Sequence, residues 1–192
     1  MINLERDTHG RVYQLWKQQQ ANSCGVASVW MARGIARQMS FAEEEWDLAV
    51  RMYQGAIGSA LGASATGPVT FNPASYASNQ STMANTFASF GLYCGQITIS
   101  LIKENLRAEQ TVLTGTPRRI RHDKIAFNKP AIVLIVWDGG GGHFVVVGRC
   151  THTEVSFLDP WNGHVNQQPN DGRYRAPYGG QGSIANIVYI SA

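Results

Sequence analysis

Short apolar runs separated by turn-forming residues fill the second half of the chain, and this pattern constrains the fold most strongly. Gly, Asp, Asn and Pro separate four β-rich segments, which are Pro130 to Trp137, His143 to Cys150, Glu154 to Leu158 and Ser183 to Ile190. The first half carries helical patterns instead, from Cys24 to about Arg37, Phe41 to about Tyr53, Ser81 to Phe90 with Gly91 as its stop, and Ser100 to about Glu109. Helices followed by antiparallel strands predict an α+β fold with segregated halves.

Two shorter strands and a long loop complete this prediction. The apolar residues of Val12 to Leu15 indicate a short strand, and another is expected at Gly95 to Ile99. Gly55 to Tyr76 is rich in Gly, Ala, Ser and Pro, which predicts a loop with at most a short strand around Val69 to Phe71. No internal repeat interrupts this order.

The size and charge of the chain bound the classes of protein that it can be. Its 192 residues, 44% hydrophobic and 15% charged, suffice for one globular domain that can divide into two lobes. The net charge of +3 is too small to indicate a nucleic-acid partner, and the basic run from Arg118 to Lys124 is interpreted as a solvated loop. No apolar run approaches the roughly 20 residues that span a bilayer, and no leader pattern opens the sequence. We expect a cytoplasmic protein; export without a cleavable signal peptide, as for a delivered effector, fits the same pattern.

The cysteines argue against a disulfide framework. Cys24, Cys94 and Cys150 are three in number and form no CxxC pair, so at least one thiol is left free. Cys150, His152 and His164 match no zinc-ligand spacing. We therefore expect neither a metal nor another cofactor.

Cys24 stands where the polar turn Gln18 to Ser23 meets an apolar helical pattern. This position is at or beside the first turn of a helix, where free backbone N–H groups and the helix dipole favour a negative charge. A thiolate is such a charge, so Cys24 is expected to be a strong nucleophile at neutral pH. The alternative is an ordinary buried cysteine in a helix.

His143 and Asp159 are the second and third candidates. His143 follows the four glycines Gly139 to Gly142 and opens an apolar run, and Asp159 ends the next β-rich segment. Because the start of one strand lies beside the end of its antiparallel partner, we expect the imidazole and the carboxylate to be hydrogen-bonded neighbours. Asp138, near the same turn, competes with Asp159 as the partner of the histidine. Cys, His and Asp are the residue types of an activated thiol, in which the imidazole takes the proton and the carboxylate orients the imidazole.

With these residues the chain resembles the papain-like cysteine peptidases. Within that group it is most similar to the bacterial peptidase C39 family, which trims double-glycine leader peptides, and to the AvrRpt2-type effector proteases. The motifs that carry the resemblance follow the family order of Gln, Cys, His and Asp, and they are Gln18, Ser23-Cys24-Gly25-Val26-Ala27, His143-Phe144-Val145-Val146-Val147-Gly148 and Leu158-Asp159-Pro160-Trp161. The middle of the chain, Gly55 to Asn128, matches nothing in these families.

The resemblance implies a single papain-like domain over residues 1–192, with a helical lobe at about 18–110 and an antiparallel β lobe at about 128–192. The chain departs from the family at Ser23, where an Asp or a similar residue usually precedes the cysteine. Its separation of Cys from His is also longer than in C39 enzymes. The extra length falls around Gly55 to Gln80, where specificity or access could be controlled.

The resemblance also implies the roles of individual residues. Cys24, His143 and Asp159 would be catalytic, and Gln18, six residues before the cysteine, would donate its side-chain amide to the oxyanion together with the backbone N–H of Cys24. The adjacent Gln19 and Gln20 leave the register of this glutamine open. Trp161 falls where papain-like enzymes place a Trp over the histidine pair; ordinary core packing is its alternative.

A thiol protease that cuts peptide bonds through a Cys24 acyl-enzyme, with His143 as base and then acid, is the leading hypothesis. Its partner would be a protein or peptide substrate, with no nucleic acid and no membrane span, and its oligomeric state is open; a bacterial effector or toxin would fit. The same triad also serves deamidases and transglutaminase-like acyltransferases, and a catalytically inactive binding module is a further alternative.

Overall fold

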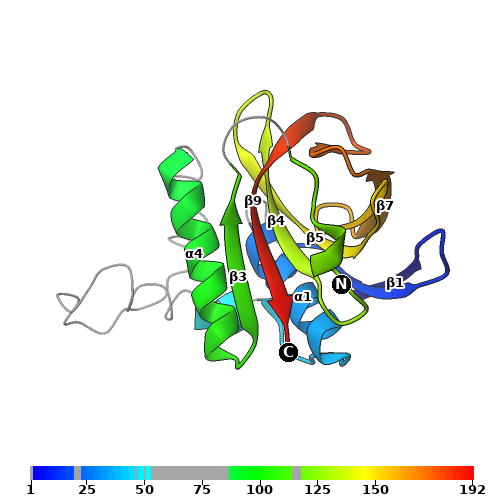
Figure 1. Ribbon diagram of the computed structural model, residues 1–192. Helices are drawn as coiled ribbons and strands as arrows, with labels where there is room; N and C mark the ends of the chain where they lie inside the picture. Colours follow the sequence, from blue (N-terminus) through cyan, green and yellow to red (C-terminus); the bar gives the residue numbers. More distant parts are fainter. Residues whose placement is uncertain (1, 20–22, 46, 50, 53–86, 114–117) are drawn as a thin grey trace.

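A computed structural model gives the structure of the chain and describes residues 2–19, 23–45, 47–49, 51–52, 87–113 and 118–192. The elements with defined bounds are β1 (Ile2–Arg6), β2 (Val12–Trp16), α1 (Cys24–Arg37), α4 (Phe87–Lys103), β3 (Arg107–Val112), a 3-10 turn (His122–Lys124), β4 (Ala131–Trp137), β5 (Gly142–Cys150), β6 (Glu154–Asp159), β7 (His164–Pro169), β8 (Arg173–Arg175) and β9 (Gln181–Ser191). Figure 1 shows an upright sheet, with α4 alongside β3 and α1 behind the strands. The fold is mixed, with a large antiparallel sheet and few helices.

The large sheet has the strand order β3-β9-β4-β5-β6-β7, and β8 pairs with β9. Every neighbouring pair in it is antiparallel. β1 and β2 form a separate hairpin. The strands predicted around Val12, in the β-rich half and at Ser183 to Ile190 are confirmed as β2, β4, β5, β6 and β9. The last strand, β9, lies between β3 and β4, so the sheet joins segments from distant parts of the sequence.

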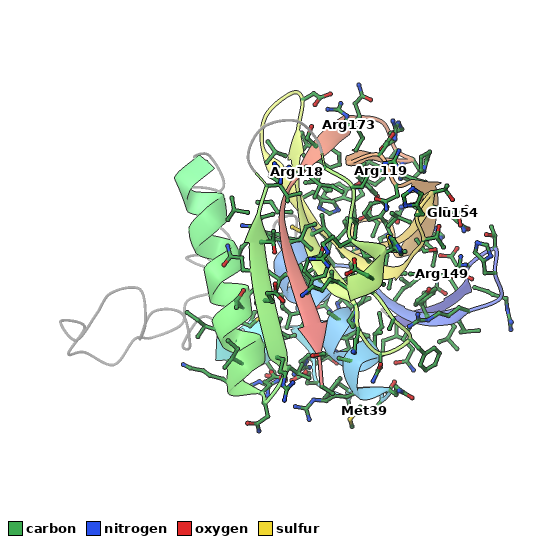
Figure 2. All side chains as sticks on the ribbon, in the orientation of Figure 1. Met39, Arg118, Arg119, Arg149, Glu154 and Arg173 are labelled. Atoms are coloured by element: carbon green, nitrogen blue, oxygen red, sulfur yellow. The ribbon has the colours of Figure 1, made fainter. Side chains whose placement is uncertain are left out.

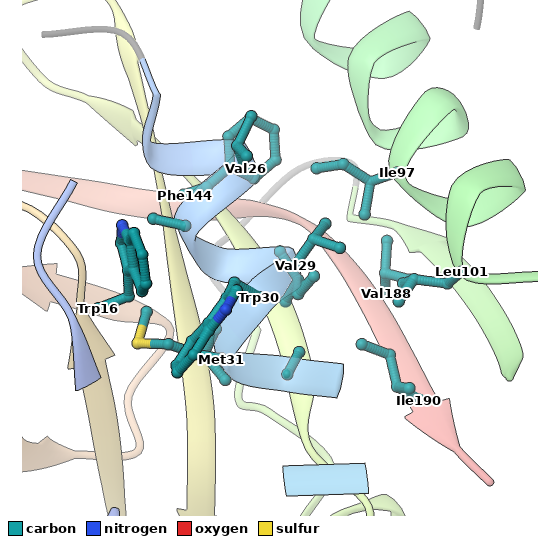
Figure 3. Packing of buried hydrophobic residues seen from close by; sticks show 14 of the residues in the cluster. Trp16, Val26, Val29, Trp30, Met31, Ile97, Leu101, Phe144, Val188 and Ile190 are labelled. Carbon is teal, nitrogen blue, oxygen red and sulfur yellow. The ribbon is translucent and has the colours of Figure 1, made fainter. Parts of the chain in front are cut away.

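Both faces of the central strand β4 are buried, and successive side chains of a strand point to opposite faces. In β4, Ile132 and Leu134 belong to the cluster that contains α1, α4 and β2, whereas Val133 and Ile135 belong to the cluster on the other face. Figure 3 shows the first cluster, in which the indole rings of Trp16 and Trp30 lie next to each other. This packing holds α1 firmly against the sheet.

The structure corrects the prediction for residues 81–109. A helix ending at Gly91, a strand at Gly95 to Ile99 and a second helix to about Glu109 are wrong, because α4 runs without interruption from Phe87 to Lys103. Residues 81–86 lie outside the described part. A glycine inside a helix costs about 1 kcal/mol relative to alanine, and burial of the apolar stripe outweighs that cost. The stripe consists of Cys94, Ile97 and Leu101, which are buried at helical spacing.

The capping box predicted at Ser40 does not form. Residues 41–44 are not helical, and helical residues first follow at Glu45. The Ser40 hydroxyl donates to Oε1 of Gln14 instead of capping a helix. Glu43 forms ion pairs with Arg33 and Arg51. The sequence pattern predicts that the Glu43 side chain caps a local helix, but this side chain forms ion pairs instead.

Several predictions fall at the surface or outside the described residues. The loop at Gly55 to Tyr76, with its possible strand and its proposed role in specificity, lies outside them. Arg118 and Arg119 of the basic run, labelled in Figure 2, are exposed, and Lys124 pairs with Glu109 at 2.9 Å. Within the described part of the chain, no helix combines the length and the apolar character required to traverse a bilayer.

Candidate active site

Cys24 is the first residue of α1, as predicted, and its side chain is half-buried. The helix begins with a hydrogen bond of 3.0 Å from the N–H of Ala27 to the carbonyl of Ser23. Ser23 makes no side-chain cap, so it does not neutralise the positive end of the helix dipole locally. The sulfur therefore sits where a negative charge is favoured.

His143 and Asp159 form a buried pair at the open end of the β5–β6 hairpin. Nε2 of His143 lies 2.7 Å from Oδ1 of Asp159, and both side chains are almost fully buried. The two strands are antiparallel, with Val146 opposite Leu158, so the predicted proximity of imidazole and carboxylate is confirmed. Asp138 is not the partner: its carboxylate pairs with Arg173.

The imidazole also meets Cys24. Burial lowers the pKa of His143, but hydrogen bonds from the imidazole to Asp159 and to Cys24, with the charges of these two groups, outweigh it and raise the pKa to about 9. Because Nε2 is occupied by Asp159, Nδ1 is the ring nitrogen left for the thiol. α1 and the hairpin thus bring Cys24, His143 and Asp159 together in the order that proton transfer requires.

Four donors surround the Asp159 carboxylate. Oδ1 accepts from His143 and, at 2.8 Å, from the backbone N–H of Trp161, while Oδ2 accepts from the hydroxyls of Tyr174 and, at 3.0 Å, Tyr178. Burial raises the pKa of Asp159. The bond to His143, the charge on that ring and the other donors lower the pKa by more, so the net shift is downward. Asp159 is therefore held as a carboxylate. Sequence reasoning missed both tyrosines, which lie on a later hairpin.

The aromatic ring over the histidine is Trp137, not Trp161. The rings of Trp137 and His143 stack with centroids 5.8 Å apart and an interplanar angle of 16°. Trp161 is 45% exposed and packs against Tyr178 at 6.0 Å. The expectation that Trp161 covers the pair is therefore not supported, because Trp137, the last residue of β4, stacks its indole on the imidazole.

The backbone of Gln18 contacts the residue that follows Asp159. Its N–H donates to the carbonyl of Pro160 at 2.8 Å, which ties the segment before Cys24 to the residue after Asp159. The side chain of Gln18 is half-buried. This position is compatible with the oxyanion role inferred from the sequence.

Glu45 holds Gln19 and Ser23, two residues that precede Cys24 in the sequence. Its buried carboxylate accepts from Nε1 of Trp16 at 2.7 Å, from the N–H of Gln19 at 3.1 Å and from the side chain of Ser23. Burial raises the pKa of Glu45, and these donors partly offset that rise. Sequence reasoning missed this contact, since nothing local to Glu45 indicates it.

The three residues weighed as metal ligands have other contacts. Cys150 donates to the carbonyl of Thr151 at 3.3 Å, His164 pairs with Glu5 at 3.1 Å, and His152 packs edge-on against His122. Among the residues with described positions, no group of three or more His, Cys, Asp or Glu side chains is arranged to hold a metal ion.

No protein-family model and no curated protein matches the sequence. Among solved structures, the chain is similar to the Pseudomonas avirulence protein AvrPphB, with a TM-score of 0.36 and 9% sequence identity. The similar region covers 89% of this chain and 92% of AvrPphB.

Proposed function

We propose that the protein is a cysteine protease that hydrolyses peptide bonds through an acyl-enzyme on Cys24. The observation that carries the proposal is the buried 2.7 Å bond between His143 and Asp159. The imidazole of His143 also contacts Cys24 at the start of α1. A histidine oriented by a carboxylate and facing a thiol is the arrangement that activates a nucleophile.

Each residue has one role in the proposed reaction. His143 takes the proton of Cys24, and the sulfur attacks the substrate carbonyl carbon. The side-chain amide of Gln18 and the backbone N–H of Cys24 donate to the oxyanion. His143 then gives its proton to the leaving amine, which departs as the C–N bond breaks and leaves a thioester on Cys24. Water, deprotonated by His143, attacks the thioester and releases the acid, while Asp159 orients the ring throughout.

The finer assignment is part of the same proposal. We infer a papain-like protease whose sequence resembles the C39-type and AvrRpt2-type peptidases. Its substrate would be a protein or peptide, and its biological role would be that of a bacterial effector or toxin. The helical lobe would span about 18–110 and the β lobe about 128–192. Cys24, His143, Asp159 and Gln18 would form its catalytic set.

The test is mass spectrometry of a mixture of unfolded proteins and peptides incubated with the enzyme. We expect new peptide ends with the wild type and none with the Cys24→Ala or His143→Ala variants. A gain of about 1 Da without cleavage would instead indicate a deamidase, and incorporation of an added primary amine would indicate an acyltransferase. Absence of all three products would favour a binding module and overturn the proposal.

A further inference from the structure

Tyr178 reaches the buried carboxylate of Asp159 from the surface. Its hydroxyl donates to Oδ2 at 3.0 Å, and 43% of the residue is exposed. Tyr174 donates to the same oxygen but is fully buried, with Phe157 edge-on against its ring at 5.1 Å. The two hydroxyls therefore donate to the same oxygen, one from the core and one from the surface. Tyr174 also packs in the hydrophobic core, whereas Tyr178 is partly exposed.

The turn between β8 and β9 fixes the position of Tyr178. The N–H of Ala176 donates to the carbonyl of Gly180 and the N–H of Gly179 to the carbonyl of Ala176, each at 3.0 Å. Gly179 and Gly180 have φ values of +99° and +92°, a region that side chains other than glycine rarely adopt. The backbone thus holds Tyr178 at a defined point over Asp159.

We propose that Tyr178 is a positioning residue of this site: its hydroxyl, together with that of Tyr174, donates to Oδ2 of Asp159 and limits how tightly this carboxylate, bonded through Oδ1 to the imidazole, holds the proton of His143. Tyr178 itself touches no reacting atom in this proposal and acts through Asp159. The inference rests on the proposed function, because it assigns a role within the same site.

Both hydroxyls donate to the Asp159 carboxylate and stabilise its negative charge. Burial, followed by the negative charge of Asp159, raises the pKa of Tyr174 and of Tyr178, so neither tyrosine ionises near neutral pH. Donors to the carboxylate favour the pair most when His143 is neutral, because the pair then carries a net negative charge. Loss of one hydroxyl should therefore make the pair hold the His143 proton more tightly.

The groups that act on this titration come from several elements. Cys24 on α1 and Asp159 on β6 act on His143 directly. Tyr174 on β8 and Tyr178 on the following turn act through Asp159. Trp137 stacks on the ring but does not titrate.

The experiment is an NMR titration of the His143 ring in the full chain, in the wild type, Tyr178→Phe and Tyr189→Phe, with His143→Gln to assign the signal. We expect the midpoint to rise by about half a pH unit or more in Tyr178→Phe. Tyr189 is the matched control, since its hydroxyl accepts from the backbone N–H of Arg121 and lies outside the site. An unchanged or lower midpoint in Tyr178→Phe, or an equal rise in Tyr189→Phe, would overturn the inference.

The failure of this inference differs from the failure of the proposed function. Rapid, His143-dependent alkylation of Cys24 in the wild type, with no shift in Tyr178→Phe, would reject the positioning role and keep the activated thiol. Absence of any cleavage by the wild type, with the expected shift in Tyr178→Phe, would reject the protease and support the positioning contact.

Discussion

The backbone N–H of Gln18 donates a 2.8 Å hydrogen bond to the carbonyl oxygen of Pro160, which joins the segment before Cys24 to the residue after Asp159. Substitution of Gln18 by Ala leaves this bond intact and removes only the side-chain amide. If that amide stabilises the oxyanion, kcat should fall by about 100- to 1,000-fold, while alkylation of Cys24 stays at the wild-type rate. Steady-state kinetics on a peptide found by mass spectrometry would measure the effect.

Gln19 provides the matched control for this experiment. Its side chain is exposed, and its contact with Glu45 is made by the backbone N–H, so Gln19→Ala should keep near wild-type kcat. The reverse pattern, with a large loss of kcat only in Gln19→Ala, would assign the oxyanion donor to Gln19 instead of Gln18.

Reaction of Cys24 with iodoacetamide should depend on His143. The pKa of His143 is raised to about 9, so an imidazolium stands beside the sulfur at neutral pH, and a cationic neighbour makes a thiol more reactive. Mass spectrometry at pH 6.5 should find Cys24 labelled at least about tenfold faster than in His143→Ala. Burial raises the pKa of Cys94 and of Cys150 to about 12, so both serve as internal thiols that stay protonated. Equal labelling of Cys24 in wild type and variant would contradict the thiol–imidazole pair.

Stability should fall as the pH rises through the His143 titration. The folded protein holds this proton up to about pH 9, whereas an unfolded histidine loses it near 6.5. The contribution is therefore fully present below pH 6.5 and lost by pH 9, and it amounts to at most about 3 kcal/mol. Urea unfolding at pH 6 and pH 9 should show this loss in the wild type and a smaller loss in Asp159→Asn. An equal loss in both proteins would show that Asp159 does not hold the proton on His143.

Arg33 should be essential for stability. It is 1% exposed, its Nη1 lies 2.9 Å from both carboxylate oxygens of Glu104, and it pairs with Glu43. Arg33→Ala removes the buried cation that pairs with Glu104 and leaves Glu43 only its pair with Arg51, which should lower the free energy of unfolding by about 3–5 kcal/mol. The exposed pair of Arg121 with Asp123 is the comparison, since Arg121→Ala should leave the free energy of unfolding nearly unchanged. Urea denaturation of both variants would decide, and similar losses would contradict the burial argument.

Glu45 should matter to the reaction although it does not reach the triad. Glu45→Ala removes the acceptor that the N–H of Gln19, the indole of Trp16 and the side chain of Ser23 share, so the residue directly before Cys24 is held less firmly. We expect kcat to fall by about tenfold or more, because small displacements of a nucleophile are costly. Glu44 is the neighbouring exposed carboxylate, and Glu44→Ala should keep wild-type kinetics. A normal kcat in Glu45→Ala, with the fold intact by circular dichroism, would exclude this anchoring role.

The sequence predicted those parts of the site that local pattern determines. The start of α1 at Cys24 and the hairpin that brings His143 to Asp159 follow from apolar periodicity and from turn residues within one segment. Tyr178 and Glu45 could not be found in this way, because each meets the site from a different element. The α4 prediction is wrong because Gly91 has the local character of a helix stop, whereas tertiary burial decides whether a helix continues through a glycine.

The place of β9 in the sheet has a consequence for synthesis on the ribosome. β4, β5 and β6 are consecutive hairpin partners, so His143 and Asp159 can meet while the chain is still growing. β3 pairs within the sheet only with β9, among the residues described, and must wait for Gln181–Ser191. Until that strand has left the exit tunnel, β4 keeps an open edge and Ile97 and Leu101 of α4 lack their partners Val188 and Ile190. A nascent chain would thus hold its histidine–carboxylate pair before it has a complete sheet, and activity should begin only after the last strand is inserted.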